Sequence, residues 1–330
     1  MPEGSKNAAS EGSDAVPVQD IRQPITIAKN MTAAANSSAL RLAIISEGIN
    51  AWPLYVAQTR QLFEENGIAV DVTLTGSSVY QLEQLKSGGF DIGFQQSDHV
   101  VRAVEGGSDL CIVMAQGHAP ELSLVTAPGI GSFTDLRGRD IAVDGANTGY
   151  ALLLRKLLAC NGLKKADYRL VEIGGSQERF DALKCGRAAA SWLNPPFDRN
   201  LMVAGFGSLG TSMQFFPAYP GSIAAARRSW AVQNAARLVA FIRGFRLACQ
   251  WLREPAHRAE AIALLPQRLQ IDAELAGRAF DAFVRRPLPA IDAAGLQQVI
   301  DVYWEAEGLR TPQGAPSRYM DLSYQQRAGV

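Results

Sequence analysis

The chain has 330 residues, in which 32 Lys and Arg residues balance 32 Asp and Glu residues, so its formal net charge at neutral pH is zero. Hydrophobic residues make up 47% of the sequence and charged residues 19%, as is typical of a folded globular protein. With no basic excess and no block of like charges, the composition argues against nucleic acid or an acidic membrane surface as the main partner.

The first 39 residues differ from the remainder of the sequence. They are rich in Ser, Ala, Gly and Asn, and we expect residues 1–39 to form a disordered leader or linker. They contain no apolar stretch of the kind found at the centre of a signal peptide. No apolar run in the chain reaches the roughly 20 residues that a membrane-spanning helix requires.

From Leu40 onwards, apolar runs alternate with segments of helical periodicity. The runs predict strands at residues 40–45, 70–74, 90–94, 110–114 and 122–125. Asn50 to Pro53, Gly76 to Ser78 and Ser97 or Asp98 mark the starts of the intervening helices. Strands that alternate with helices at this spacing indicate βαβ units and a mainly parallel sheet.

A second set of strands and helices follows Pro128, Gly129 and Gly131. Strands are predicted at residues 141–143, 168–172 and 188–192. Between the first two, apolar residues from Tyr150 to Leu158 recur at helical spacing. After Pro217 and Pro220, the pattern from Leu238 to Leu252 predicts a long helix, and two further helical patterns follow it. We expect this helical tail to pack on the first sheet.

Four segments of the sequence resemble one known family. They are Pro53–Ala57 with Phe63–Ile68, Gln84–Gly93, Phe133–Val143 and Trp192–Pro196. In their order and spacing they resemble the nitrate/sulfonate/taurine-type periplasmic solute-binding proteins of ABC transporters and their thiamine-precursor-binding relatives. The resemblance extends over about residues 40–305, and no single segment is specific by itself.

The resemblance implies a two-lobed α/β fold, the type II periplasmic-binding-protein fold, with mainly parallel sheets and a ligand cleft between the lobes. On this interpretation residues 40–126 and 222–330 form the first lobe and residues 127–221 form the second. The hinge is expected at about residues 126–132 and 217–223.

Candidate ligand-binding residues come from the turns that follow strands. In open α/β sheets ligands bind outside the carboxyl ends of the strands, where helix N-termini favour anionic or strongly polar groups. The candidates are Asn50, Trp52, Ser77, Ser78, Gln96, Ser97, His118, Asn147, Thr148, Gly149 and Asn194. Simpler roles stay open for several of them: the serines and Thr148 as helix caps, and Trp52 as a packing aromatic.

The sequence does not favour catalysis or metal binding. Its four cysteines, Cys111, Cys160, Cys185 and Cys249, are far apart and have no histidine at metal-ligand spacing. It contains no G-x-S-x-G or H-E-x-x-H motif. The thiamine-precursor synthases that share this fold carry a cysteine-rich segment, which is missing here. We therefore expect a protein that is not an enzyme and that needs no metal or cofactor.

The predicted function is the capture of a small organic, anionic solute, such as a sulfonate or carboxylate, for an ABC importer. Its partners would be the permease and ATPase subunits, and the binding protein itself would be a monomer in the periplasm. The alternative is a cytosolic enzyme on the same fold, such as a decarboxylase or a pyrimidine-precursor synthase, which the lack of a visible signal peptide favours. A ligand-sensing module is a third hypothesis, although no output domain is apparent.

Overall fold

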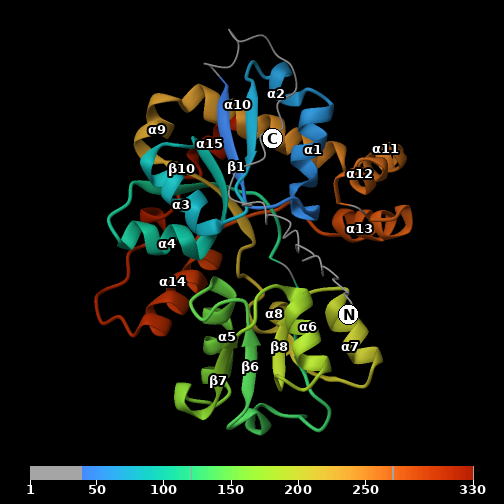
Figure 1. The fold of residues 1–330 in the computed structure, drawn as a ribbon. Coiled ribbons are helices and arrows are strands. Elements are labelled where there is room, and N and C mark those ends of the chain that lie inside the picture. The colour runs from blue at the N-terminus through green and yellow to red at the C-terminus, as the bar shows by residue number, and fades with distance from the viewer. Residues whose placement is uncertain (1–38, 120, 270, 330) are drawn as a thin grey trace, which may run out of the picture.

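The computed structural model describes residues 39–119, 121–269 and 271–329. It contains two five-stranded sheets, each flanked by helices, that lie one above the other in Figure 1. The predicted leader, residues 1–39, lies outside the described residues except for Ala39. No helix in the described part of the chain is long and apolar enough to span a membrane.

The first sheet has the strand order β2-β1-β3-β10-β4. β1 pairs in parallel with β2 and β3, whereas β10 runs antiparallel to both β3 and β4. The strands are β1 (Leu40–Ile44), β2 (Val70–Leu74), β3 (Ile92–Gln96), β4 (Leu110–Ala115) and β10 (Ser222–Arg227), and the helices between them are η2 (Ile49–Ala51), α1 (Trp52–Thr59), α2 (Leu62–Glu65), α3 (Ser78–Ser87) and α4 (Ser97–Glu105).

The second sheet repeats this plan with the order β7-β6-β8-β5-β9. β6 pairs in parallel with β7 and β8, and β5 runs antiparallel to β8 and β9. The strands are β5 (Ser123–Thr126), β6 (Asp140–Val143), β7 (Arg169–Glu172), β8 (Ala190–Leu193) and β9 (Gly207–Thr211); the helices are η3 (Phe133–Leu136), α5 (Gly149–Cys160), η4 (Lys165–Asp167), α6 (Ser176–Lys184), α7 (Phe197–Val203) and α8 (Ser212–Phe215). Each sheet is therefore mainly parallel, as the sequence predicts, with one antiparallel strand.

The position of β5 corrects one expectation. The sequence analysis placed residues 122–125 in the first lobe and the first crossing at 126–132, but β5 pairs with strands of the second sheet. The chain therefore crosses between the sheets through residues 116–122 and returns through 216–221. An apolar run identifies a strand but not its partner, so the sequence pattern could not assign β5 to a sheet.

The two crossing segments are joined to each other. The backbone N–H groups of Gln116 and Gly117 both donate to the carbonyl of Ser222, at 2.8 and 3.0 Å. The approach is so close that a Cβ at Gly221 would clash with backbone atoms of Gly117, His118 and Ala119. Glycine is therefore required where the connections pass each other.

Helices from the C-terminal part of the chain cover the first sheet. They are α9 (Arg228–Gln233), α10 (Ala235–Trp251), η5 (Pro255–His257), α11 (Arg258–Ala263), α12 (Leu265–Leu269), α13 (Ala273–Arg285), α14 (Ala293–Glu307), η6 (Pro316–Arg318) and α15 (Ser323–Ala328). The predicted apolar face of α10 is buried, and Phe241 stacks on Phe63 of α2 with ring centroids 5.4 Å apart. The helical tail thus packs on the first sheet, as predicted.

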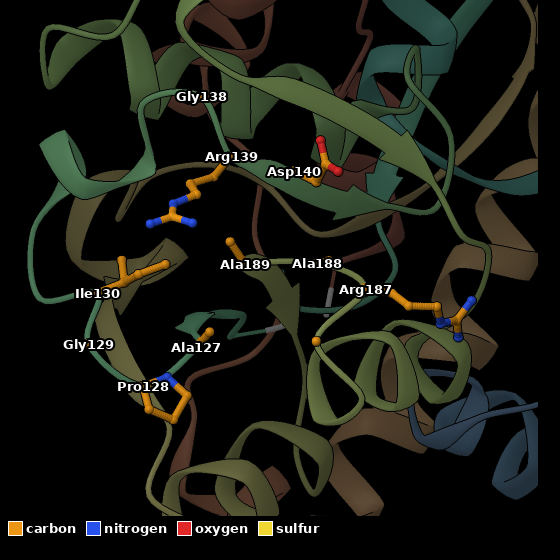
Figure 2. Close-up of a pocket in the computed structure, with 11 residues that line it drawn as sticks. Ala127, Pro128, Gly129, Ile130, Gly138, Arg139, Asp140, Arg187, Ala188 and Ala189 are labelled. Atoms are coloured by element: carbon orange, nitrogen blue, oxygen red, sulfur yellow. The ribbon is translucent and has the colours of Figure 1, made fainter.

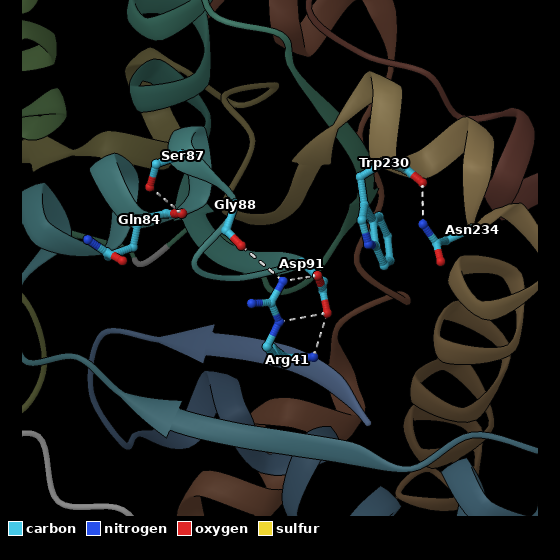
Figure 3. A network of polar contacts seen from close by, with 7 residues as sticks. All are labelled: Arg41, Gln84, Ser87, Gly88, Asp91, Trp230 and Asn234. Carbon is cyan, nitrogen blue, oxygen red and sulfur yellow. Dashed lines mark hydrogen bonds and ion pairs between the residues drawn. The ribbon is translucent and has the colours of Figure 1, made fainter. Parts of the chain in front are cut away.

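A forked ion pair fixes the start of the first sheet (Figure 3). Nε and Nη2 of Arg41 donate to the two carboxylate oxygens of Asp91 at 3.2 and 2.6 Å. The same carboxylate accepts the backbone N–H of Arg41, and the Arg41 guanidinium also reaches the carbonyl of Gly88. Because Asp91 is buried, these bonds offset the cost of removing its charge from water.

Candidate ligand-binding site

A cavity of about 220 Å³ lies at the carboxyl ends of β6 and β8. Its walls come from these strands, from the first turns of α5 and α6, and from the segment that enters β5. The lining residues are Leu122, Ala142, Val143, Asp144, Tyr150, Ala151, Ser176, Arg179, Trp192 and Asn194. This is the edge of a mainly parallel sheet at which ligands bind in open α/β folds.

Two buried donors beside this cavity have no hydrogen-bond partner in the described part of the chain. They are the indole Nε1 of Trp192, a residue that is 4% exposed, and Nε of Arg179. A buried donor left unsatisfied costs about 1–3 kcal/mol. An acceptor supplied by a bound molecule would remove this cost.

One guanidinium, two carboxylates and a helix N-terminus determine the charge around the cavity. Burial lowers the pKa of the Arg179 guanidinium, and the carboxylates of Asp144 and Glu178 oppose that shift. Two other donors of Arg179 are engaged, since Nη1 bonds the carbonyl of Gly174 and Nη2 bonds Oγ of Ser176 at 3.3 Å. The N-terminus of α6, at Ser176, adds the positive end of a helix dipole to the same wall.

The start of α5, beside the cavity, contacts the first lobe. Gly149 begins α5, and a Cβ at this position would lie 2.5 Å from Oδ1 of Asp98 in α4. Nη1 of Arg102 donates to the carbonyl of Asn147 at 3.1 Å, and its Nη2 is paired with Asp98. The predicted turn at 147–149 therefore lies directly against the first lobe, next to the lining residue Tyr150.

A second contact between the lobes runs along α5. Leu152 and Leu153 belong to the same hydrophobic cluster as Val299 and Ile300 of α14, and Lys156 forms an ion pair with Glu305 of that helix. The small cavity therefore lies in the part of the second lobe that faces the first.

Trp52 is not a cleft residue, contrary to the sequence prediction. Its side chain is fully buried, its indole Nε1 donates to the carbonyl of Ala261 at 3.1 Å, and its ring packs against Phe280 and Phe283. Tyr55 of the same helix is also buried in this core. The helices α11 and α13 cover this face of α1, and their position could not be inferred from the local pattern.

The hydroxyl candidates cap helices. Ser77 accepts the N–H of Tyr80 at the start of α3, where Ser78 is the first helical residue, and Thr148 accepts the N–H of Ala151 at the start of α5. Ser97 opens α4 after Gln96, and its buried Oγ has no partner in the described part of the chain. The structure places none of these side chains in the lining of the small cavity.

The other candidates occupy separate positions. The carbonyl of Asn50 accepts Nε2 of Gln116 in the first crossing segment. His118 belongs to that segment, and its Nε2 lies 2.8 Å from the carbonyl of Pro287. Asn194 is the candidate that lines the cavity, where its Oδ1 accepts the hydroxyl of Ser176 at 2.6 Å.

Arg179, Trp192 and Ser176 were missed as site residues. In the sequence, Trp192 ends a predicted strand and begins the segment Trp192–Pro196 that resembles the family, and neither feature marks its side chain as a ligand contact. One signal was present: Arg179 follows the start of α6 by a single turn, so its charge lies near the edge at which the helix begins.

A larger cavity, of about 510 Å³, lies at the opposite ends of the same strands (Figure 2). Its walls include the backbone from Ala127 to Ile130 and the side chain of Arg139. Figure 2 shows the side chain of Arg187 directed away from the other lining residues. Asp140, on its rim, is paired with Arg169.

In the described residues, no cluster of histidine, cysteine and carboxylate side chains has the arrangement of a metal site. All four cysteines are free thiols: Cys111 and Cys249 are buried, and Cys160 and Cys185 are exposed. Burial raises the pKa of both buried thiols to about 12.

Two sheets of matching order joined by two crossings define the fold of the two-lobed periplasmic binding proteins. The structure aligns with the periplasmic aliphatic sulphonate binding protein SsuA from Escherichia coli at a TM-score of 0.68, with 21% identity over 86% of this chain and 92% of that one. It aligns with the periplasmic nitrate-binding protein NrtA from Synechocystis at a TM-score of 0.68, with 14% identity over 88% of each chain.

The family model described as NMT1/THI5 like matches residues 49–257, more than half of the sequence, and the chain belongs to this family. The chain is also 25% identical, over 237 residues, to the bicarbonate transport ATP-binding protein CmpC of Synechocystis. That alignment covers 66% of this chain and 35% of CmpC, so the chain spans about a third of the curated relative it matches. The family and the fold that the sequence resemblance implied are both confirmed.

Proposed function

We propose that this protein is the solute-binding component of an ABC importer and captures a small organic anion between its two lobes. The observation that carries the proposal is the cavity at the carboxyl ends of β6 and β8, beside which Trp192 and Arg179 keep unused donors. A pocket with a few convergent polar groups is typical of a binding site for a small molecule.

The two connections between the lobes support a hinge. In the described part of the chain, residues 116–122 and 216–221 connect the two sheets, and the N–H groups of Gln116 and Gly117 bond the carbonyl of Ser222, which directly follows the second connection. Bending at such paired crossings would let the lobes open and close about the cavity, as in other binding proteins of hinge type. The contact of Gly149 with Asp98 would then belong to the closed arrangement.

The relatives support the same class of function. SsuA is named as a sulphonate-binding protein and NrtA as a nitrate-binding protein, and both names describe the capture of small anions in the periplasm. CmpC is named as an ATP-binding protein of bicarbonate transport. On this proposal the present chain works in the periplasm, delivers its solute to a membrane permease coupled to an ATPase, and performs no chemistry on it.

The test combines a thermal-shift screen with small-angle X-ray scattering. Sulfonates, carboxylates and pyrimidines are screened at neutral pH, and the radius of gyration is measured with each solute that raises the melting temperature. A solute at a hundred times its Kd stabilises the folded state by about 2.7 kcal/mol, which raises the melting temperature by about 5 °C. We expect an anion to produce this rise, with a radius of gyration no larger than that of the free protein.

The same samples test the alternative that the protein is an enzyme on the same fold. Mass spectrometry after prolonged incubation shows whether a bound solute has been chemically converted. Turnover would contradict the binding-protein proposal in favour of an enzyme. If no solute of the panel binds, the proposed function itself is wrong.

A further inference from the structure

We propose that Trp192 and Arg179 determine the specificity of the site, and that they select the monoanionic oxyanion head of a small organic acid. This inference rests on the proposed function and goes beyond it, since it names the donors and the charge of the group they bind. Trp192 and Arg179 line one cavity with Asn194 and Ser176, and each of the first two holds a buried donor without a partner among the described residues.

The two donors are complementary to an oxyanion. The indole N–H and the guanidinium N–H can only donate hydrogen bonds, so neither can be satisfied by a donor group on a ligand. Charge-assisted bonds to an anionic oxygen are stronger than bonds to a neutral one. Both nitrogens have almost no solvent-accessible surface, so on this proposal an acceptor in the cavity reaches them only after neighbouring side chains move.

The charge balance of the lining favours one negative charge on the ligand. In the described lining, Arg179 is the only cationic side chain and Asp144 the only anionic one. The positive charge of Arg179 and of the α6 N-terminus is already partly offset by Asp144 and by the neighbouring Glu178, so it can balance at most one negative charge on the ligand. A second negative charge would have no cation of its own and would be repelled by Asp144.

The size of the cavity limits the group it holds. About 220 Å³ accommodates a sulfonate or carboxylate head with a short carbon chain. Apolar side chains of Leu122, Val143 and Tyr150 line the remainder of the wall and suit such a chain. Sulfonate and carboxylate share the chemistry that the donors recognise, and the experiment separates them.

The experiment uses ethanesulfonate, propionate, the neutral propionamide and ethyl phosphate as probes of similar size. Ethyl phosphate is largely a dianion at pH 7.5 because its second pKa is about 6. Affinities are measured by calorimetry on the parent protein, Trp192→Phe and Arg179→Lys. The first variant keeps an aromatic ring without the N–H group, and the second keeps a cation without Nε.

Matched controls are available in the chain. Trp251→Phe removes another buried indole N–H that has no partner in the described residues, but in α10 on the first lobe. Arg187→Lys changes an arginine at the larger cavity. A general effect on binding of removing a buried indole N–H, or an arginine of the second lobe, would appear in these controls as well.

We expect at least one monoanion to bind the parent at least tenfold more tightly than propionamide or ethyl phosphate. Trp192→Phe and Arg179→Lys should each weaken that affinity by about 10- to 100-fold, and the controls should change it less than about twofold.

In ¹⁵N–¹H spectra, the indole signal lost in Trp192→Phe identifies Trp192. Its proton should move downfield when the anion is added to the parent, further than those of the other four tryptophans.

Three results would overturn the inference. They are equal affinity for propionamide, unchanged affinity in Trp192→Phe, and failure of both monoanions to bind at about 10 mM. If a neutral pyrimidine binds and alters the scattering profile without moving the Trp192 signal, the proposed function stands and this inference fails. If no solute of either panel binds, both fail.

Discussion

The second lobe has a cavity at each end of strands β6 and β8, and the two differ in more than size. The cavity at the far end is the larger, at about 510 Å³ against about 220 Å³. At the far end, Asp140 is paired with Arg169, and Nε of Arg187 bonds the thiol of Cys185 at 3.2 Å. At the near end, Trp192 and Arg179 keep unused donors.

We place the proposed site at the near end because of this difference, since empty volume alone gives a ligand no polar interaction to complete. The charged side chains of the far cavity are exposed to water, as Arg139 is, or already paired, as Asp140 is, so a ligand there gains little beyond what water offers. A buried donor without a partner destabilises the free protein and gives a ligand an interaction to complete. The near cavity also faces the first lobe, whereas the far cavity lies at the outer edge of the sheet.

The largest expected effect comes from filling each cavity in turn. Ala151 lines the near cavity and Ala189 the far one. We expect Ala151→Leu to weaken binding of the best-bound monoanion by more than about 100-fold because the added carbons occupy the ligand's space, with about 1–3 kcal/mol lost from folding. Ala189→Leu should bind like the parent. Calorimetry on both variants would contradict this comparison if Ala189→Leu were the one that lost binding.

The next largest effect is on the free energy of unfolding, and it is tested at two glycines, one at each end of the second lobe. Gly221→Ala places a methyl group against backbone atoms of the other crossing segment, so we expect the free energy of unfolding to fall by about 1–3 kcal/mol. Gly131→Ala, in the loop beyond Ile130, has open space around its Cβ and should change stability by less than about 0.5 kcal/mol. Urea denaturation measures both; equal losses would mean that the crossings are not tightly packed.

The pH dependence of stability gives a smaller effect. Burial lowers the pKa of His99, in α4 on the cleft side of the first sheet, below its usual value of 6.5; Asp98 opposes this shift and Arg102 reinforces it. The unfolded chain therefore binds a proton at a higher pH than the folded protein does. The free energy of unfolding should fall as the pH drops below about 6.5, until the histidine is protonated in the folded state as well.

Denaturation curves between pH 5 and 8 measure this fall in the free energy of unfolding. In His99→Gln, the free energy of unfolding should depend less steeply on pH. His257→Gln provides the control, since His257 stacks on Trp251 away from the cleft. An unchanged profile in His99→Gln would assign the pH dependence to other groups.

The smallest effect concerns a thiol near the far cavity. The hydrogen bond from Arg187 lowers the pKa of the exposed Cys185 thiol, and thiolates are the reactive form. We expect a maleimide at pH 7 to label Cys185 and Cys160 but not the buried Cys111 and Cys249. Arg187→Gln should slow labelling of Cys185 by less than about tenfold. Peptide mass spectrometry shows the order in which the cysteines are labelled. Early labelling of Cys111 would contradict its burial in the core of the first lobe.

The sequence predicted the strands with nearly continuous apolar runs, such as β1 and β6, because most of their side chains are buried. It missed β9, whose residues Gly207–Thr211 include only one large apolar side chain, and β10, whose three alanines do not read as a strand. Both are recognised only from their pairing with strands distant in the sequence.

Two tryptophans show why the site was harder to predict than the fold. Trp52 follows a strand and was expected in the cleft, but α11 and α13 cover it. Trp192 was read as a strand residue, yet its side chain lines the near cavity. Local pattern indicates where a turn begins, whereas exposure depends on tertiary packing against distant helices.

The most direct test of the binding site uses 2-bromoethanesulfonate, whose bromine scatters anomalously. Crystals grown with this anion should show one strong anomalous peak between the lobes, in the cavity lined by Trp192 and Arg179. A peak in the far cavity beside Arg139, with none between the lobes, would contradict the account.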